Sequence, residues 1–109
     1  MDLVLRPGTA ADAGECGRIC FEAFAGIARE HGFPPDVPSP EAGAALTEMA
    51  LRHPGFYSVV AELDGRIVGS NFLDERSAVV GVGPVTIDPS VQNRGVGRRL
   101  MRDVMDRAA

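Results

Sequence analysis

The sequence contains no lysine, and all eleven of its basic residues are arginine. A Walker A loop ends in Lys followed by Ser or Thr, because that lysine contacts the phosphates of the nucleotide. The absence of lysine therefore excludes nucleotide binding through a loop of this kind.

Long hydrophobic runs are also missing, although 45% of the 109 residues are apolar. No stretch approaches the roughly 20 apolar residues that a membrane-spanning helix needs, and the N-terminus has no signal-peptide pattern. Cys16 and Cys20 are four residues apart on one predicted helix, a spacing that favours neither a metal cluster nor a disulfide. These features predict one cytoplasmic domain with free thiols, no metal and no membrane partner.

Charge is distributed unevenly along the chain. Residues 92–109 carry five arginines and two aspartates, a net charge of +3, whereas the remaining residues carry −7, which gives the overall −4. Binding of DNA or RNA needs a broad basic surface, so we expect no nucleic-acid partner. The acidic part suits a cationic amine ligand, or serves only to keep the protein soluble.

The first half of the sequence predicts a strand and two helices. Leu3–Pro7 is expected to form a strand that Pro7 ends, and Thr9 with Asp12 is expected to cap a helix over about 10–30. The apolar face of this helix comprises Ile19, Cys20, Ala23, Phe24 and Ile27. After a proline-rich loop, Ser39 is expected to cap a second helix that starts with Pro40 and ends near Arg52.

The second half predicts a meander and a final helix. Strands over 57–63 and 66–74 flank Asp64-Gly65, a dipeptide typical of a type I′ hairpin turn. A third strand over 78–87 contains Pro84, which cannot donate a ladder hydrogen bond, so we predict a β-bulge there. The apolar face of the final helix, which begins near Gly95, comprises Val96, Leu100, Met101, Val104 and Met105.

Between that strand and that helix lies the motif Gln92-x-x-Gly95-x-Gly97, preceded by an Asp88-Pro89 turn. Backbone N–H groups of a glycine turn and of the first helical turn point at one spot, where the helix dipole adds roughly half a positive charge. Glycines at both positions would allow positive φ and close approach of an anion. The motif predicts a phosphate site, although a tight strand-to-helix connection with surface arginines is the alternative. A dinucleotide fingerprint is excluded, because it needs a third glycine where this sequence has Leu100.

With the strand before it and the helix after it, this motif resembles the acetyl-CoA loop of the GCN5-related N-acetyltransferase (GNAT) superfamily. The order strand, two helices, sheet extends the resemblance over essentially the whole chain. It implies an α/β mixed-sheet fold in which residues 1–109 form a single incomplete domain that stops after the pyrophosphate-loop helix. A whole domain continues with a strand, a helix and usually two more strands. The chain is therefore expected to be a fragment, or to have its open sheet edge completed by another chain, at least as a homodimer.

The resemblance implies acetyl-CoA as acyl donor and direct attack by a small-molecule or peptide amine. Backbone groups of Val85, Thr86 and Ile87 would pair with the pantetheine arm. The pyrophosphate would lie on Gln92, Asn93, Arg94, Gly95, Val96, Gly97 and Arg98. A non-catalytic acyl-CoA-binding or regulatory module is the second hypothesis, favoured by the shortened domain and by the missing strand carboxylate.

No catalytic residue is assigned from the sequence. Members of the superfamily often use a Glu on the strand before the loop, and the strand over 79–87 has no carboxylate. The other candidates each have a structural interpretation, as solvated strand residues, helix-end cations or a core side chain: Glu62, Asp74, Glu75, His31, His53 and Tyr57.

Overall fold

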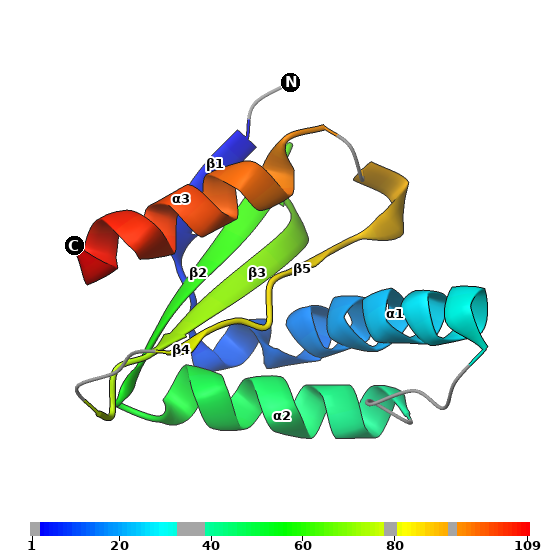
Figure 1. Ribbon diagram of the computed structural model, residues 1–109, viewed down its shortest axis with the longest axis horizontal. Helices are drawn as coiled ribbons and strands as arrows, with labels where there is room; N and C mark the ends of the chain where they lie inside the picture. The colour runs from blue at the N-terminus through cyan, green and yellow to red at the C-terminus, as the bar shows by residue number, and fades with distance from the viewer. Residues whose placement is uncertain (1–2, 33–38, 78–80, 92–93) are drawn as a thin grey trace.

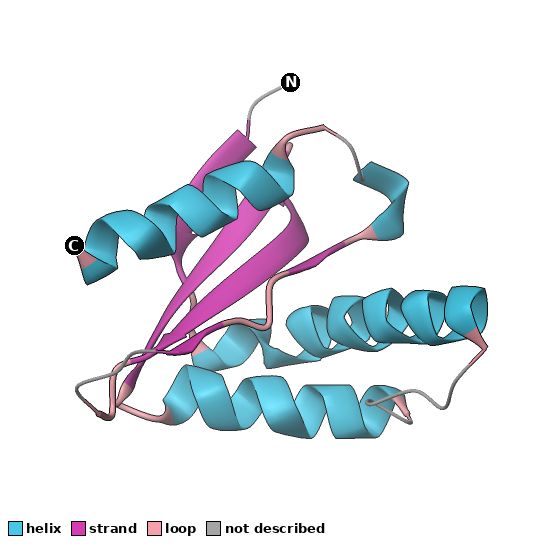
Figure 2. Ribbon diagram, viewed as in Figure 1, coloured by secondary structure: helices cyan, strands magenta, loops and turns pink. Residues whose placement is uncertain are grey.

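The computed structural model describes residues 3–32, 39–77, 81–91 and 94–109. An antiparallel sheet lies between two layers of helices (Figure 1). One face of the sheet is covered by α1 (Ala13–His31) and α2 (Pro40–Arg52), and the other by α3 (Val96–Ala108). Figure 2 shows the sheet between the helices. The expected α/β fold is confirmed, with every described strand pairing antiparallel.

The strands follow the order β1-β2-β3, after which two short strands share the far side of β3. Their bounds are β1 Leu3–Pro7, β2 Phe56–Leu63, β3 Arg66–Asp74, β4 Gly81–Val82 and β5 Thr86–Ile87. The turn between β2 and β3 has positive φ at both central residues, 54° at Asp64 and 81° at Gly65, as a type I′ hairpin requires.

Helix starts follow the predicted capping residues. The Ser39 hydroxyl accepts a hydrogen bond from the Ala42 N–H at 3.1 Å, and Pro40 is the first residue of α2. The first helix differs at its start, since Ala10–Asp12 forms a 3₁₀ turn, η1, before α1. There the Asp12 carboxylate accepts hydrogen bonds from the Thr9 N–H at 2.8 Å and from Arg6 at 2.9 Å. The bond to Arg6 ties this turn to β1.

Side chains alternate between the two faces of β2. Val59, Ala61 and Leu63 belong to a buried cluster with α3. Val60, between them in the strand, is also buried but is not part of that cluster. The buried side chains of the cluster under α3 are Val59, Ala61, Leu63, Val68, Leu73, Val91, Val96, Leu100 and Val104.

Three predicted core positions are wrong. Ile27 on α1 is 49% exposed, and Met101 and Met105 on α3 are exposed as well. On α3 the buried residues are Val96, Leu100 and Val104, each four residues apart. The two methionines follow this stripe by one position, about 100° around the helix, and therefore lie on its flank.

The predicted third strand, over 78–87, is also corrected. It is two short strands, β4 and β5, separated by Gly83, Pro84 and Val85. Residues 78–80 of the prediction lie outside the described part of the chain.

Candidate functional site

The interruption between β4 and β5 is a one-residue bulge. Val82 pairs with Leu73 on β3, whereas Thr86 pairs with Ser70, so Pro84 and Val85 both fall opposite a single β3 residue, Asn71. Gly83, with φ of 112°, donates its N–H to the Phe72 carbonyl at 2.8 Å just before the bulge. Because an extra residue bends a strand away from its partner, the bulge opens this edge of the sheet. The bulge predicted from Pro84 is confirmed.

Beyond β5, the chain passes through a 3₁₀ turn, η2 (Pro89–Val91), to the start of α3. Gly95 is the N-cap of α3 and has φ of 82°, in the left-handed region that favours glycine. The Arg99 N–H is bonded to the Gly95 carbonyl, so the N–H groups of Val96, Gly97 and Arg98 precede the first helical bond. The end of α3 that carries these donors and the positive end of the helix dipole faces the loop.

Gly97 has a different role from the one expected. Its φ is not in the left-handed region, and it lies inside α3. A Cβ at this position would lie 2.7 Å from Cδ1 of Ile87. Gly97 therefore allows α3 to pack closely on β5, which places the helix start beside the end of the bulged strand.

The remaining predicted cofactor residues are distributed along this path. Val85 is exposed at the bulge, Thr86 is buried with its hydroxyl 3.4 Å from that of Ser70, and Arg98 is exposed on the first turn of α3. Arg94, also exposed, precedes the cap. Gln92 and Asn93 lie outside the described residues.

Asp88, predicted only as part of a turn, is a buried charge. It directly follows β5, and its carboxylate accepts bonds from Arg18 on α1 at 3.1 Å and from Arg66 on β3 at 3.4 Å. Its partners are 70 and 22 residues away in the sequence, so no local pattern could have indicated them.

The carboxylates considered as bases are paired with arginine. Glu62 accepts from Arg6 at 2.7 Å, and Glu75 accepts from Arg107 at 3.0 Å. Asp74 accepts from Arg76, which lowers the pKa of this half-buried carboxyl to about 2. A general base needs a pKa near the working pH, so the Asp74 carboxylate is poorly suited to that role.

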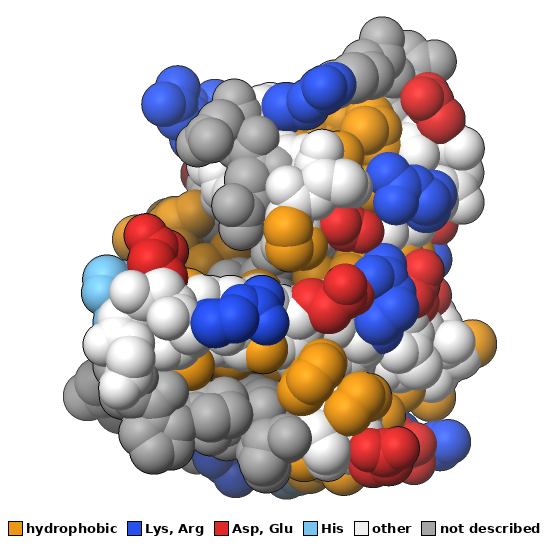
Figure 3. Space-filling model, turned by 90° about the vertical axis from the view of Figure 1, so that its right-hand side faces the viewer, with side chains coloured by type: hydrophobic (Ala, Val, Ile, Leu, Met, Phe, Trp, Pro, Cys, Tyr) orange, Lys and Arg blue, Asp and Glu red, His pale blue; other side chains and the backbone are white. Residues whose placement is uncertain are grey.

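Two grooves lie next to these elements. One, of about 270 Å³, lies between α1 and η2 and is lined by Glu22, Ala23, Gly26, Ile27, Arg29, Glu30 and Pro89. Figure 3 shows the right-hand side of the molecule, where acidic and basic side chains lie next to one another across the middle.

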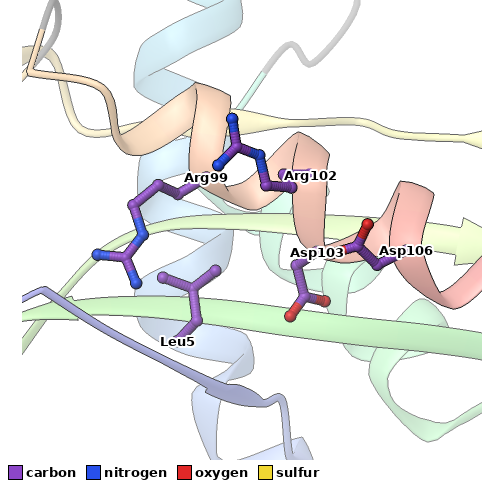
Figure 4. A pocket seen from close by; sticks show the side chains of 5 residues that line it. All are labelled: Leu5, Arg99, Arg102, Asp103 and Asp106. Carbon is purple, nitrogen blue, oxygen red and sulfur yellow. The ribbon is translucent and has the colours of Figure 1, made fainter.

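The other groove lies between β1 and α3. The residues that line it are Leu5 of β1 and Arg99, Arg102, Asp103 and Asp106 of α3. In Figure 4 the Arg99 and Asp103 side chains extend towards the strand that carries Leu5, whereas those of Arg102 and Asp106 point away from it. Two of them are engaged within the fold, because Arg99 bonds the Leu3 carbonyl and Asp103 accepts from Tyr57. We therefore do not place the site there.

The two cysteines of α1 are not placed for catalysis or metal binding. Cys16 and Cys20 are buried free thiols, and burial raises the pKa of Cys16 to about 11, which keeps it protonated at neutral pH. Within the described ranges, no group of His, Cys, Asp or Glu could hold a metal ion. Nor is any helix there long and apolar enough to cross a membrane.

Several solved structures with a similar fold are acetyltransferases. A GNAT family acetyltransferase from Brucella melitensis, in complex with acetyl-CoA, is 22% identical with a TM-score of 0.71, over 97% of this chain and 68% of that one. An aminoglycoside N-acetyltransferase in complex with CoA is 17% identical with a TM-score of 0.71, over 98% of this chain and 69% of that one. A ribosomal-protein-alanine N-acetyltransferase from Brucella melitensis biovar Abortus is 16% identical with a TM-score of 0.67, over 99% of this chain and 72% of that one. At these identities the likeness shows the fold.

A search of curated proteins found no match. The family model described as "Acetyltransferase (GNAT) family", however, matches residues 21–109, which include the bulged strand, the loop and α3. The family, the fold and the expectation of acetyl-CoA as the family's acyl donor are thereby confirmed. The chain belongs to the GNAT acetyltransferase family.

Proposed function

We propose that this protein is an acetyl-CoA-dependent N-acetyltransferase that transfers acetyl to a primary amine by direct attack. The observation that carries the proposal is that the bulge at Pro84–Val85 directly precedes β5, while the glycine-capped start of α3 packs through Gly97 on Ile87, the last residue of β5. A long ligand with a polar arm and a pyrophosphate would contact both.

The start of α3 supports the pyrophosphate end of this assignment. Donors from Val96 to Arg98 precede the first helical bond, and Arg98 adds a positive charge on the same turn. Charge-assisted bonds from N–H groups to phosphate are stronger than neutral ones. The pantetheine arm would lie along the opened edge, paired with the backbone of Val85, Thr86 and Ile87.

In direct transfer the protein forms no covalent bond with the acetyl group. The amine nitrogen forms a bond to the acetyl carbon, the carbon–sulfur bond breaks, and the products are an amide and CoA thiol after the amine loses a proton. Holding the two reactants together removes much of the entropic barrier, and a backbone donor at the bulge would stabilise the oxyanion. We assign no general base.

The acceptor is proposed to be a cationic amine. The groove between α1 and η2 is next to the loop and contains the carboxylates of Glu22 and Glu30. Glu22 is paired with Arg18, so the carboxylate that would attract a protonated amine in this groove is that of Glu30.

Titration of acetyl-CoA into the purified chain, followed by calorimetry, tests the cofactor site. We expect a Kd in the micromolar range. Arg98→Glu should raise that Kd about tenfold, equivalent to about 1.4 kcal/mol, because it reverses a charge at the proposed phosphate position.

Arg102→Glu is the matched control. Arg102 is also an exposed arginine of α3, and its replacement by Glu changes the net charge by the same amount. It lies a full helical turn beyond Arg98, away from the start of the helix. Its Kd should stay close to that of the unaltered chain. Equal weakening by both variants, or no binding by a folded chain, would contradict the proposed site.

A non-catalytic acyl-CoA-binding module is the alternative, because the described strands β4 and β5 carry no carboxylate. It predicts acetyl-CoA binding without release of CoA thiol when amines are added. A thiol-release assay over a panel of polyamines, aminoglycosides and peptide N-termini separates the two functions.

We also propose that the edge at β4, ahead of the bulge where the pantetheine arm would lie, is covered in the working protein by a second copy of the chain. In the described part of the sheet β4 pairs only with β3, and Val82 on this strand is exposed. An uncovered edge of this kind favours association.

A further inference from the structure

Asp88 is the residue at which the chain leaves the sheet. Its N–H donates to the Val68 carbonyl of β3 at 2.7 Å, which extends the pairing of β5 by one residue. Its carbonyl accepts from the Val91 N–H at 3.0 Å, which closes the η2 turn. Asp88 is thus bonded to the sheet on one side and to the loop on the other.

The Asp88 side chain adds three more bonds. Oδ1 accepts from the Ser90 N–H at 3.0 Å, and Oδ2 accepts from Arg18 at 3.1 Å and Arg66 at 3.4 Å. The carboxylate is 9% exposed. A single buried carboxylate therefore joins η2, α1 and the start of β3.

Arg18 is itself held by neighbours on α1. Its guanidinium donates to Glu15 at 2.6 Å and pairs with Glu22, one turn to either side. Each of the three guanidinium nitrogens of Arg18 thus contacts a carboxylate, and the third reaches across to Asp88. Glu22, which pairs with Arg18, and Pro89, which follows Asp88 in the chain, both line the groove between α1 and η2.

The far end of the loop is anchored differently. Val91 and Val96, on either side of the remaining loop residues, both lie in the cluster under α3. Charge therefore holds the start of η2 at Asp88, whereas hydrophobic packing holds Val91 at its end and Val96 at the start of α3. Removal of the charge should loosen only the first of these anchors.

The ionic state of Asp88 suits this role. Burial opposes ionisation, yet the Ser90 N–H and the Arg18 guanidinium together hold the pKa of this carboxyl below its ordinary value. The carboxylate is therefore charged throughout the neutral range.

We infer that Asp88, through Arg18 and Arg66, is a positioning residue that holds the loop between β5 and α3 in the form that receives the pyrophosphate. The inference rests on the proposed acetyl-CoA site. Because Arg18 belongs to α1, this helix would both line the groove proposed for the acceptor and hold the cofactor loop through Asp88.

Asp88→Asn tests the inference, because the amide oxygen can still accept from Ser90 while the charge that holds the two arginines is lost. We expect the Kd for acetyl-CoA to rise at least fivefold in calorimetry. Hydrogen–deuterium exchange of peptides within residues 89–98 should become faster in the free protein, with the other elements unchanged. Arg18→Gln should move both measurements in the same direction.

Asp12→Asn is the matched control. Asp12 is an equally buried aspartate, with its side chain also 9% exposed, and it pairs with Arg6 rather than with the loop. It should lower the stability of the fold while leaving both the Kd and the exchange of residues 89–98 unchanged. All variants are compared at a temperature where circular dichroism shows them folded.

The outcomes separate the two proposals. Weaker binding and faster loop exchange in Asp88→Asn, but not in Asp12→Asn, support the inference. If the unaltered chain binds acetyl-CoA and Asp88→Asn binds equally well, Asp88 is merely structural and the inference is overturned. If the unaltered chain, although folded, does not bind, the proposed site fails and the inference fails with it.

Discussion

Tyr57 is the only tyrosine of a chain without tryptophan, so its phenol can be titrated by absorbance without interference. The hydroxyl donates to Asp103 Oδ1 at 2.5 Å, and the Arg107 guanidinium carbon lies 4.3 Å from the ring centroid. Burial, followed by the bond to Asp103, raises the pKa of Tyr57 to about 12. This phenol therefore ties β2 to α3 and is not poised to act as an acid at neutral pH.

We predict a tyrosinate titration with its midpoint near pH 12 in the folded protein. Asp103→Asn should lower the midpoint, because it removes the negative charge that disfavours the tyrosinate and replaces a carboxylate acceptor by a weaker amide acceptor. Since the folded pKa is raised, the stability from this group is present below the ordinary pKa of about 10 and is lost as pH rises towards the folded value. A midpoint at the ordinary value, with circular dichroism showing a folded chain, would contradict the hydrogen bond.

Asp12 is expected to make the stability of the fold depend on pH in the acid range, in the opposite sense to Tyr57. The pKa of Asp12 is lowered, mainly by its hydrogen bonds with Arg6 and to a smaller extent by that with the Thr9 N–H, although burial opposes this. Its contribution is therefore present above the ordinary pKa of about 3.9 and is lost as pH falls towards the folded value. Asp12→Asn should reduce the free energy of unfolding in urea by about 1.5–3 kcal/mol at pH 7, and by less at pH 3. The same loss at both pH values would argue against the ion pair as its source.

At the scale of the elements, the contact of α1 with α2 depends on two glycines. A Cβ at Gly17 would lie 2.5 Å from the Ala44 Cα, and one at Gly43 would lie 2.5 Å from the Gly17 carbonyl oxygen. Both clashes are with backbone, so rotation of a side chain cannot relieve them. The helices approach this closely because each has a glycine, Gly17 on α1 and Gly43 on α2, where it meets the backbone of the other.

We predict that Gly17→Ala lowers the free energy of unfolding by about 1–3 kcal/mol, since the helices must separate. Gly26→Ala in the same helix is the control, because nothing lies within 4 Å of its Cβ position. There alanine should stabilise the protein by up to about 1 kcal/mol through its higher helix propensity. Urea unfolding measures both, and equal effects would contradict the close crossing.

Elements with short-range signals were predictable to within a few residues. The bounds of β1, α2 and β3 match the predictions, because prolines, a serine cap and a type I′ turn set them locally. The interrupted strand was predictable only as a bulge. Its division into β4 and β5 depends on the register of each half against β3, which is a property of the pairing.

For the whole molecule, the open edge predicts self-association. Light scattering at tens of micromolar should give the mass of a dimer. Val82→Lys should shift the protein towards monomer, because a charge on an edge strand disfavours pairing. Val4→Lys is the control, since Val4 is also exposed but lies on β1, at the other side of the sheet. A monomer for the unaltered chain would contradict the proposed dimer.

The sequence by itself determined the family, the order of the elements and the glycine cap of α3, because each depends on residues close together in the chain. Only the tertiary structure decided that Gly97 packs on Ile87, that Met101 and Met105 are exposed, and that Asp88 is held by Arg18. These facts depend on contacts between segments far apart in the sequence. Burial and pairing energies arise from the folded arrangement as a whole, so local patterns do not record them.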